Sequence, residues 1–387
     1  MNQPVIVEAG RTAVGKRNGH FADVHASHLL SKAQVGVLER AGVDPGAVGQ
    51  VVGGCVTQAG EQASNVTRTA WLTAGLPYQV AGTTIDCQCG SSQQANHMIA
   101  NLISAGAIDI GMACGVEHMS KVWLGANVPR VDDTTFINGS SKPADFSIDM
   151  PDQFGAAERI AQRRGITRER VDMLGLISQQ KALRATEEGR FEREIIPVDV
   201  TLADGTAVTV NRDQGLRDTT AEKLAALNPV MPNGIHTAGN SSQISDGAGA
   251  VLMMTLEKAN ELGLKPRAKV VDSCLVGVDP VLMLTGPIDA TQRLLERNNL
   301  SIDQIDTFEI NEAFASVVLA WAKEVGADLD KTNPNGGAIA LGHPLGGTGV
   351  ILTTKALYEL ERTGGKYGLI SMCCGGGLGT GTLIERL

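Results

Sequence analysis

Cys89 is the residue whose type and position are best suited to covalent chemistry. The β-branched run 83–85 predicts the end of a strand, and apolar residues recur at helical spacing from Ala95 to Ile103. Cys89 therefore falls on the strand-to-helix turn, where Gly90 allows the backbone to bend. The helix N-terminus places partial positive charge beside the sulfur and favours the thiolate over the thiol. We expect Cys89 to be a nucleophile, the alternative being a small buried hydrophobe.

The neighbouring residues have predicted roles of their own. Ser91 or Ser92 is expected to cap the free N–H groups of the first helical turn. Cys87 still belongs to the strand and is expected to be structural. The seven cysteines are odd in number and sparse for 387 residues, which disfavours a disulfide framework. The pairs 87/89 and 373/374 lack the two-residue spacing usual in zinc sites, so we expect no metal.

An internal repeat predicts a second reactive turn. The segment VLERAGVDPGAVGQVVG from Val37 aligns without gaps with LLERNNLSIDQIDTFEI from Leu294, and both predict a helix, a short turn and a strand. Each copy continues into a turn with a reactive residue, then a helix and a strand, so Cys89 and His343 occupy equivalent turns. A pseudo-two-fold arrangement would bring these turns together between the halves, at the carboxyl ends of strands.

The composition indicates a globular α/β protein of more than one packed unit. Hydrophobic residues make up 43% of the chain, while 46 glycines and only 7 Phe, 3 Trp and 3 Tyr indicate tight turns and an aliphatic core. The net charge of −9 argues against a general nucleic-acid surface. The first residues show no signal-peptide pattern and no apolar run reaches the length of a membrane span, so a cytoplasmic protein without membrane contact is expected.

The middle of the chain differs in amino-acid composition from the two repeats. Residues 118–242 contain a loop rich in Pro, Gly, Asp and Ser, and then an amphipathic helical pattern with interspersed basic and acidic residues. A glycine-rich loop and an apolar strand follow. We therefore predict an inserted loop domain at 118–242, an N-terminal half made of 1–117 and 243–265, and a C-terminal half at 266–387.

Four ordered motifs carry a resemblance to a known family. They are CGSS from Cys89, NEAFA from Asn311, GHPLG from Gly342 and CCGGG from Cys373. With these motifs the chain resembles the thiolases, or acetyl-CoA acyltransferases, over essentially its whole length. The resemblance implies the α/β thiolase fold, a five-layered αβαβα arrangement of two pseudo-repeated halves. The stretch CQCGSSQQANH is also similar to actinobacterial thiolases of steroid side-chain degradation.

The resemblance implies a role for each reactive residue. Cys89 would accept the acyl group as a thioester, His343 would activate its thiol, and Cys373 would remove or return the α-proton of the acetyl group. Asn311 would hold a water that helps His343 stabilise the enolate oxygen. The backbone N–H groups of Cys89 and Gly375 would form the other oxyanion hole. Carbon–carbon cleavage needs such a nucleophile, acid/base and pair of oxyanion sites.

Coenzyme A is the implied co-substrate, and no permanently bound cofactor is expected. The resemblance places Arg217 beside the adenine and Ser242 near the pantetheine, with Ala313 and Phe314 along the tunnel. A neutral pantetheine arm suits an apolar channel, while the phosphates can stay in water at the surface. The family's pantetheine-contacting His-Met pair is replaced here by Asp152-Gln153, which leaves that contact open.

The implied activity is CoA-dependent thiolytic cleavage of 3-ketoacyl-CoA to acetyl-CoA and a shortened acyl-CoA, in fatty-acid or steroid side-chain β-oxidation. The alternatives are a biosynthetic acetoacetyl-CoA thiolase, a ketoacyl synthase of the same fold and a thiolase-like lipid-binding protein. The NEAF and CCGGG motifs argue against the synthase, and the intact catalytic set argues against lost chemistry. Cys374 stands where the family commonly has a small or aliphatic residue, and register with the family selects Cys373 as the acid/base. Family members are homodimers or homotetramers, so a homo-oligomer is expected.

Overall fold

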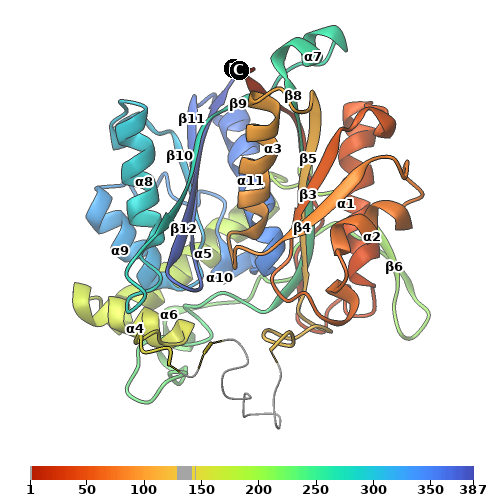
Figure 1. Ribbon diagram of the computed structural model, residues 1–387. Coiled ribbons are helices and arrows are strands. Elements are labelled where there is room, and N and C mark those ends of the chain that lie inside the picture. Colours follow the sequence, from red (N-terminus) through yellow and green to blue (C-terminus); the bar gives the residue numbers. More distant parts are fainter. Residues whose placement is uncertain (1, 129–141, 144) are drawn as a thin grey trace.

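The computed structural model describes residues 2–128, 142–143 and 145–387, and its elements follow the predicted order (Figure 1). The chain begins with β1 (Pro4–Arg11), β2 (Gly15–Lys16), α1 (Ala26–Ala41), the 3-10 helix η1 (Pro45–Ala47), β3 (Gln50–Gly54), η2 (Gly60–Gln62), α2 (Val66–Thr73), β4 (Ala81–Ile85), α3 (Ser91–Ser104) and β5 (Ile110–His118). The middle segment contains α4 (Gln153–Arg164), α5 (Arg168–Glu187), β6 (Val198–Thr201), β7 (Ala207–Val210) and α6 (Ala221–Ala225). The remainder comprises β8 (Ser245–Thr255), α7 (Leu256–Glu261), β9 (Ala268–Gly277), α8 (Gly286–Arg297), η3 (Ile302–Gln304), β10 (Thr307–Ile310), α9 (Ala315–Val325), α10 (Ala338–Leu341), η4 (Leu345–Gly347), α11 (Thr348–Thr363), β11 (Tyr367–Cys374) and β12 (Leu378–Arg386).

The two halves of the chain build the same strand order. In the described residues one sheet runs β10-β11-β12-β9-β1-β8-β5-β3-β4, so the order β10-β11-β12-β9 repeats as β3-β5-β8-β1. The halves join where β1 pairs antiparallel with β9 through Val5–Lys269 and Ile6–Ala268. The short helices η1 and η3 fall at matching positions of the ungapped alignment. The internal repeat read from the sequence is therefore present in the fold.

The layers alternate as the resemblance implies. Figure 1 shows α3 and α11 side by side between the two halves of the sheet, with α1 and α2 outside one half and α8 and α9 outside the other. The two central helices pack closely because a Cβ at Gly349 of α11 would lie 2.1 Å from the backbone nitrogen of Gln93 in α3. The five-layered αβαβα thiolase arrangement is thus confirmed, with the turns that precede α3 and α11 at the centre.

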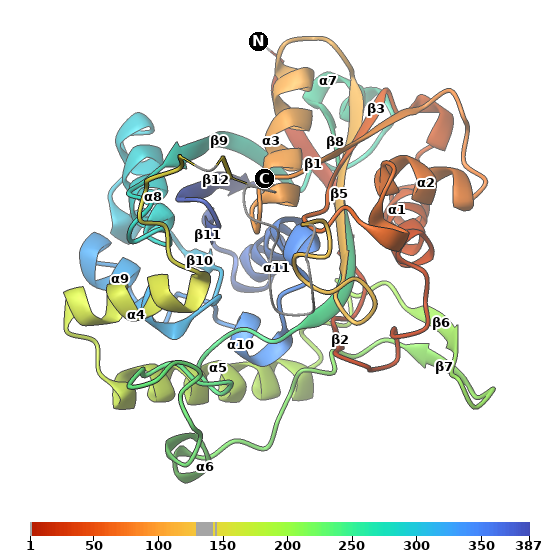
Figure 2. The same ribbon diagram turned by 60° about the horizontal axis from the view of Figure 1, so that its bottom comes forward.

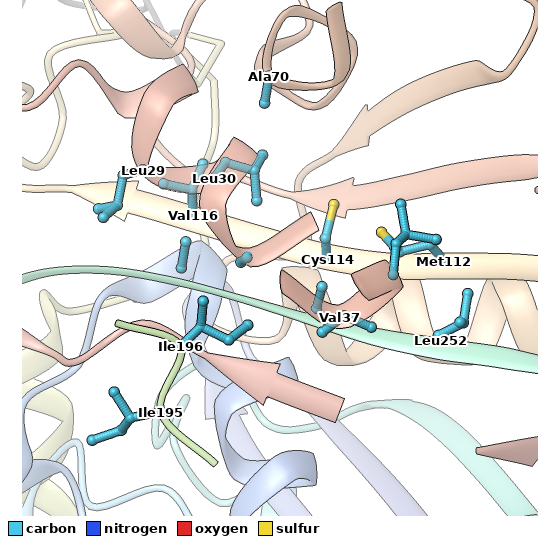
Figure 3. Close-up of a cluster of buried hydrophobic side chains, with 14 of the residues drawn as sticks. Leu29, Leu30, Val37, Ala70, Met112, Cys114, Val116, Ile195, Ile196 and Leu252 are labelled. Atoms are coloured by element: carbon cyan, nitrogen blue, oxygen red, sulfur yellow. The ribbon is translucent and has the colours of Figure 1, made fainter. Parts of the chain in front are cut away.

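The outer layer of the first half rests on an aliphatic core. Leu29, Leu30 and Val37 of α1 are fully buried against Met112 of β5 and its neighbours (Figure 3). The helix ends at Gly42, whose φ of +64° is the left-handed cap that glycine favours. The scarcity of aromatic residues in the sequence is reflected in this core, which is built mostly from Val, Leu, Ile and Met.

The middle segment leaves the layered body and returns to it. Strand β8 pairs with β1 and with β5 of the first half. Helices α4, α5 and α6 lie at the end of the molecule opposite the C-terminus (Figures 1 and 2). Part of the predicted Pro- and Gly-rich loop, 129–141 and 144, lies outside the described residues. Among the described helices, none is both long and apolar enough to cross a bilayer.

Candidate active site

The turn that carries Cys89 forms where the sequence predicts it. Strand β4 ends at Ile85 and α3 begins at Ser91, so Cys89 stands directly before the helix. Gln88 adopts a φ of +51°, a left-handed conformation that is unusual for a residue with a side chain. The carboxylate of Asp86 accepts a hydrogen bond from the Gln88 N–H at 2.7 Å and so closes the turn locally. The sharp turn presents Cys89 ahead of the helix N-terminus.

The predicted serine cap of α3 is wrong. The N-cap residue is Gly90, and no side chain bonds the first turn of the helix. Ser91 instead accepts a hydrogen bond from the Cys87 N–H at 2.9 Å and donates one to the Gln88 carbonyl at 2.6 Å. Ser92 accepts from the Val350 N–H of α11 at 3.1 Å. Ser91 therefore stabilises the turn before α3, and Ser92 links α3 to α11. Neither hydroxyl caps the helix, because each bonds a partner outside its first turn.

The backbone N–H groups of Gly375 and Cys89 lie close enough to the Cys89 sulfur to favour its thiolate and lower its pKa. It is 5% exposed, and burial raises the pKa of the thiol to about 12, with the carboxylates of Glu117 and Asp86 acting in the same direction. The expectation of a resting thiolate is thus wrong, because desolvation of the charged sulfur outweighs the helix N-terminus and the two N–H donors. Cys89 needs a base at the moment it reacts.

His343 is held at both ring nitrogens. Thr348 donates its hydroxyl hydrogen to the Pro344 carbonyl at 2.8 Å, so the same oxygen can only accept from the imidazole Nδ1, which lies 2.6 Å away. Nδ1 therefore carries the proton and Nε2 presents its lone pair, to which the Asn311 amide Nδ2 donates at 3.2 Å. Burial lowers the pKa of His343 to about 4. The ring is a neutral base near pH 7.

Asn311 enters the site from the end of β10. Its backbone N–H donates to the Ser371 carbonyl of β11 at 3.0 Å, which fixes the loop after the strand against the neighbouring strand. The Nδ2 group reaches His343, whereas the buried Oδ1 atom has no hydrogen-bond partner among the described residues. A free buried amide oxygen beside the imidazole fits a residue that holds a water, since buried polar atoms need partners.

Strand alternation separates Cys373 from Cys374. The two residues end β11, where successive side chains point to opposite faces. Cys373 lines the same cavity as Cys89, and burial, with the nearby Cys89, raises the pKa of its thiol well above the usual range. The Cys374 sulfur instead lies where a Cβ of Gly90 would approach it to 2.7 Å. Cys373, and not Cys374, therefore shares the cavity with Cys89.

A cavity of about 180 Å³ opens onto these groups. It includes three of the residues predicted to contact CoA (Ser242, Ala313 and Phe314), and Gln153 also lines it. Asp152 does not; its carboxylate caps α4 by accepting from the Gly155 N–H at 2.7 Å. The lining as a whole is mostly apolar and consists of Cys89, Met119, Leu124, Gln153, Phe154, Ser241, Ser242, Gln243, Ile244, Leu284, Ala313, Phe314, His343, Leu345 and Cys373.

Arg217 is the predicted site residue that the structure does not bring to the cavity. Its side chain is exposed outside the lining, and both terminal nitrogens donate to the Ala238 carbonyl at 3.2 Å. The contact of Arg217 with the adenine of CoA stays a prediction. A larger hollow of about 820 Å³, lined by charged residues such as Arg193 and Arg267, contains neither thiol nor imidazole.

Two residues that shape the site escaped the sequence reasoning. Thr348, which sets the tautomer of His343, follows it by five residues within the GHPLGGT stretch. Glu117 is fully buried at the end of β5 and accepts four hydrogen bonds. Its donors are the backbone N–H groups of Val56, Thr57 and Gly346 and the Gln62 amide. The sequence signal for Glu117 was a single acidic residue near the end of an otherwise apolar strand.

Seven further Asp, His and Cys residues have no part in the predicted chemistry: six are buried in the layers, and Asp86 is exposed on the Cys89 turn. Among the described residues, no group of three or more His, Cys, Asp or Glu side chains converges as a metal site would require. The buried set consists of His97, His118, His236, Cys55, Cys114 and Cys274.

A buried cysteine, a neutral imidazole and a second thiol in the same cavity are groups that fit an acyltransferase. The chain belongs to the thiolase family: the model described as "Thiolase, N-terminal domain" matches residues 4–257 and "Thiolase, C-terminal domain" matches 264–386. It is 44% identical to the steroid 3-ketoacyl-CoA thiolase FadA6 of Mycobacterium tuberculosis, over 100% of this chain and 95% of that protein. It is 43% identical to a 3-ketoacyl-CoA thiolase of Aliivibrio fischeri, over 100% of both chains. Among solved structures, the Bacillus anthracis acetyl-CoA acetyltransferase superposes with a TM-score of 0.91 at 36% identity, covering 100% of this chain and 99% of that one.

Proposed function

We propose that the protein cleaves 3-ketoacyl-CoA with free CoA, releasing acetyl-CoA and an acyl-CoA shortened by two carbons. The observation that carries this proposal is the meeting of Cys89, His343 and Cys373 in one apolar cavity. Cys89 supplies the nucleophile, Cys373 a second ionisable thiol and His343 a neutral base. The names of the relatives in M. tuberculosis and A. fischeri support the same reaction.

In the first half-reaction, the Cys89 sulfur attacks the 3-keto carbon as its proton passes to Nε2 of His343. The N–H groups of Cys89 and Gly375 are near enough to the sulfur to favour negative charge on it, so they can stabilise the oxyanion that forms on the attacked carbon. The bond between C2 and C3 then breaks, leaving a thioester on Cys89. The departing acetyl-CoA enolate takes its proton from Cys373, while the imidazolium and the Asn311 site stabilise the enolate oxygen.

In the second half-reaction, the thiol of CoA gives its proton to the Cys373 thiolate and attacks the Cys89 thioester. The same two N–H groups stabilise the oxyanion of this second tetrahedral intermediate. When the intermediate collapses, the acyl group leaves on CoA and the Cys89 sulfur recovers its proton from His343. Every proton moved in the first half-reaction is thereby returned, and the chain is ready for another turnover.

The two thiols can be told apart by what each serine variant still does. Cys89→Ser should form no acyl-enzyme, because an alkanol is far less ionised than a thiol. Cys373→Ser should still take up one acetyl group from acetyl-CoA, while carbon–carbon cleavage falls by roughly two to four powers of ten, the range expected for a lost general acid or base. Intact-mass spectrometry after acetyl-CoA, run beside loss of the magnesium–acetoacetyl-CoA enolate absorbance, measures both.

The matched control is Cys374→Ala, since Cys374 neighbours the proposed acid/base but faces away from the cavity. Cleavage by this variant should stay within a few-fold of the parent protein. A Cys373→Ser protein that cleaves normally, or a Cys89→Ser protein that still acetylates, would show that the roles are assigned wrongly.

We further propose that CoA is a co-substrate and not a resident cofactor, with Arg217 near its adenine and Ser242 near its pantetheine. Gln153 on the cavity wall supports a contact to the pantetheine or acyl group from the Asp152-Gln153 position. A kinetic panel of 3-ketoacyl-CoA thioesters, from acetoacetyl to steroid-bearing, would select between fatty-acid and steroid substrates. Preference for acetoacetyl-CoA alone would favour a biosynthetic role.

We also propose that the protein is a cytoplasmic homodimer or homotetramer. The β4 strand stands at the edge of the sheet, and its Ala81 and Thr83 are exposed, so its outer backbone groups can pair with another chain. Light scattering at micromolar concentration should give a multiple of 40.5 kDa. A stable species near 40.5 kDa would contradict this.

A further inference from the structure

The four cysteines around the site form two distinct pairs. Cys89 and Cys373 line the cavity, whereas Cys87 and Cys374 do not. The Cys87 and Cys374 thiols shift each other's pKa, and the Cys374 thiol, on the opposite face of β11 from Cys373, also donates to the Met372 carbonyl at 3.7 Å. The reaction proposed above uses only the first pair. The second pair is a contact between two thiols that the reaction leaves unexplained.

The backbone around the second pair is shaped for close approach. A Cβ on Gly90 would lie 2.7 Å from the Cys374 sulfur, so only glycine at this position lets the sulfur reach the Cys89 turn. Cys87 is anchored by the Ser91 hydroxyl, which bonds its N–H. On the other side, Cys374 ends its strand and is followed by Gly376 and Gly377 at φ of +82° and +77°. The glycine turn allows the end of β11 to adjust, whereas the Cys87 side is fixed.

The two pairs also differ in reactivity. The neighbouring Cys374 thiol lowers the pKa of the Cys87 thiol. Burial raises the pKa of both Cys89 and Cys373. Because the thiolate is the form that attacks an oxidant, Cys87 is the most reactive of the four toward peroxide. Cys87 also keeps 8% of its surface exposed, while Cys374 keeps none.

We propose that Cys87 and Cys374 are a modification site, in which a hydroperoxide converts the pair reversibly into a disulfide separate from the catalytic thiols. The Cys87 thiolate attacks the outer peroxide oxygen, the O–O bond breaks, and water or an alcohol leaves, giving a sulfenic acid. The Cys374 sulfur then attacks the Cys87 sulfur, the S–O bond breaks, and water leaves with the Cys374 proton. Two thiols lose two electrons together and one peroxide gains them.

The disulfide would act on the site through Gly375. Bonding requires the two sulfurs to approach to about 2.05 Å, closer than two thiols in van der Waals contact, so the end of β11 moves toward Cys87. Gly375 directly follows Cys374, and its N–H is one of the two donors to the Cys89 sulfur. Complete loss of an oxyanion donor lowers turnover by roughly 10²–10³, so a displaced donor should cost about tenfold or more. Reduction by a dithiol should restore the rate.

Peptide mapping with variants tests the pairing. Trypsin leaves Cys87 and Cys89 together in peptide 69–121, and Cys373 and Cys374 together in 367–386, so the mass of a linked peptide pair does not identify the bond. After hydrogen peroxide and alkylation of free thiols, the double variant Cys89→Ala/Cys373→Ala should still give the linked pair. It should disappear on adding dithiothreitol. Absence of the linked pair in this double variant would overturn the proposal.

Activity supplies the second measurement and does not depend on the assignment of the catalytic roles. At the peroxide dose that lowers the thiolysis rate of the parent protein tenfold, Cys374→Ala should retain most of its rate, because its Cys87 has lost this partner. Cys87→Ala provides the same test from the other side of the pair. Equal inactivation of both variants and the parent would mean that oxidation acts on Cys89 or Cys373, and the proposal would be wrong.

Discussion

Replacing Thr348 by valine should slow acylation of Cys89 without weakening substrate binding. The change exchanges one hydroxyl for a methyl group of similar size in a buried position, 2% exposed. It removes the acceptor for the His343 Nδ1–H, at 2.6 Å, and the donor to the Pro344 carbonyl, at 2.8 Å. Thr348 does not line the 180 Å³ cavity, so KM should change little.

The size of the effect follows from the unsatisfied proton. If Nδ1 keeps its proton, a buried donor is left without a partner, which costs about 1–3 kcal/mol. If the proton moves to Nε2 instead, the ring no longer offers a lone pair to the Cys89 proton. Either way the reactive tautomer becomes less favourable by about 1–3 kcal/mol, which corresponds to a loss of roughly 5- to 150-fold in the acylation rate.

The assay is a rapid-quench measurement of Cys89 acylation from acetoacetyl-CoA, read by intact mass, together with steady-state kcat and KM. Thr348→Ser keeps the hydroxyl and should restore the rate to within a few-fold of the parent. Thr353→Val is a matched control on the same helix: its hydroxyl donates to the Gly349 carbonyl at 2.9 Å and accepts from the Asn96 amide at 3.0 Å. It should lose comparable stability but not activity.

Three outcomes would refute the reasoning. A Thr348→Val protein that acylates at the parental rate would mean that the hydroxyl does not select the tautomer. Thr348→Ser as slow as Thr348→Val would point to the methyl group and its packing. Equal loss of activity in Thr353→Val would mean that any damage to α11 has the same effect.

Three further predictions concern stability. Gly349→Ala should lower the free energy of unfolding in guanidinium chloride by at least about 1–3 kcal/mol, because its Cβ would meet the Gln93 nitrogen at 2.1 Å, whereas Gly277→Ala, with nothing within 4 Å, should be nearly neutral. Burial lowers the pKa of His97 to about 3, whereas in the unfolded chain it is about 6.5, so the unfolded chain binds more protons between these values. The free energy of unfolding should therefore decline by on the order of a few kcal/mol as pH falls from about 6.5 toward 3. In His97→Gln the slope of this decline should be smaller by the equivalent of up to one bound proton. Glu117→Gln turns an amide NH₂ toward backbone N–H donors, so the melting temperature and kcat should both fall by more than in the control Glu8→Gln, whose carboxylate lines the separate charged hollow.

The sequence was informative where the signal is local. Apolar periodicity, β-branched runs and glycine stops predicted β4, α3 and the turn between them. The alignment of the halves then predicted that Cys89 and His343 stand on equivalent turns before α3 and α11. Strand alternation also explains why Cys373, and not Cys374, lines the cavity, while the role of Cys373 as the acid/base stays a prediction. These features depend on the order of residues within about twenty positions.

The features that were missed depend on contacts between distant parts of the chain. Glu117 accepts from the Gly346 N–H across 229 residues, and Ser92 accepts from the Val350 N–H across 258. No local pattern distinguishes such a serine from a helix cap. The hydroxyl of Thr348 is only five residues from His343, but its role rests on the direction of one hydrogen bond to Pro344. Local propensity contains no information on that direction.

The error over the Cys89 thiolate explains how this site has to work. Burial raises the pKa of Cys89 to about 12 and lowers that of His343 to about 4, so a resting thiolate–imidazolium pair is unfavourable on both sides. A proton can then leave the sulfur only as the new carbon–sulfur bond forms, since the negative charge passes at once to the carbonyl oxygen. The helix N-terminus and the N–H groups of Cys89 and Gly375 are directed toward that developing charge. Their contribution therefore belongs to the transition state, and a free thiol that resists ionisation at rest is consistent with a fast nucleophile once substrate is bound.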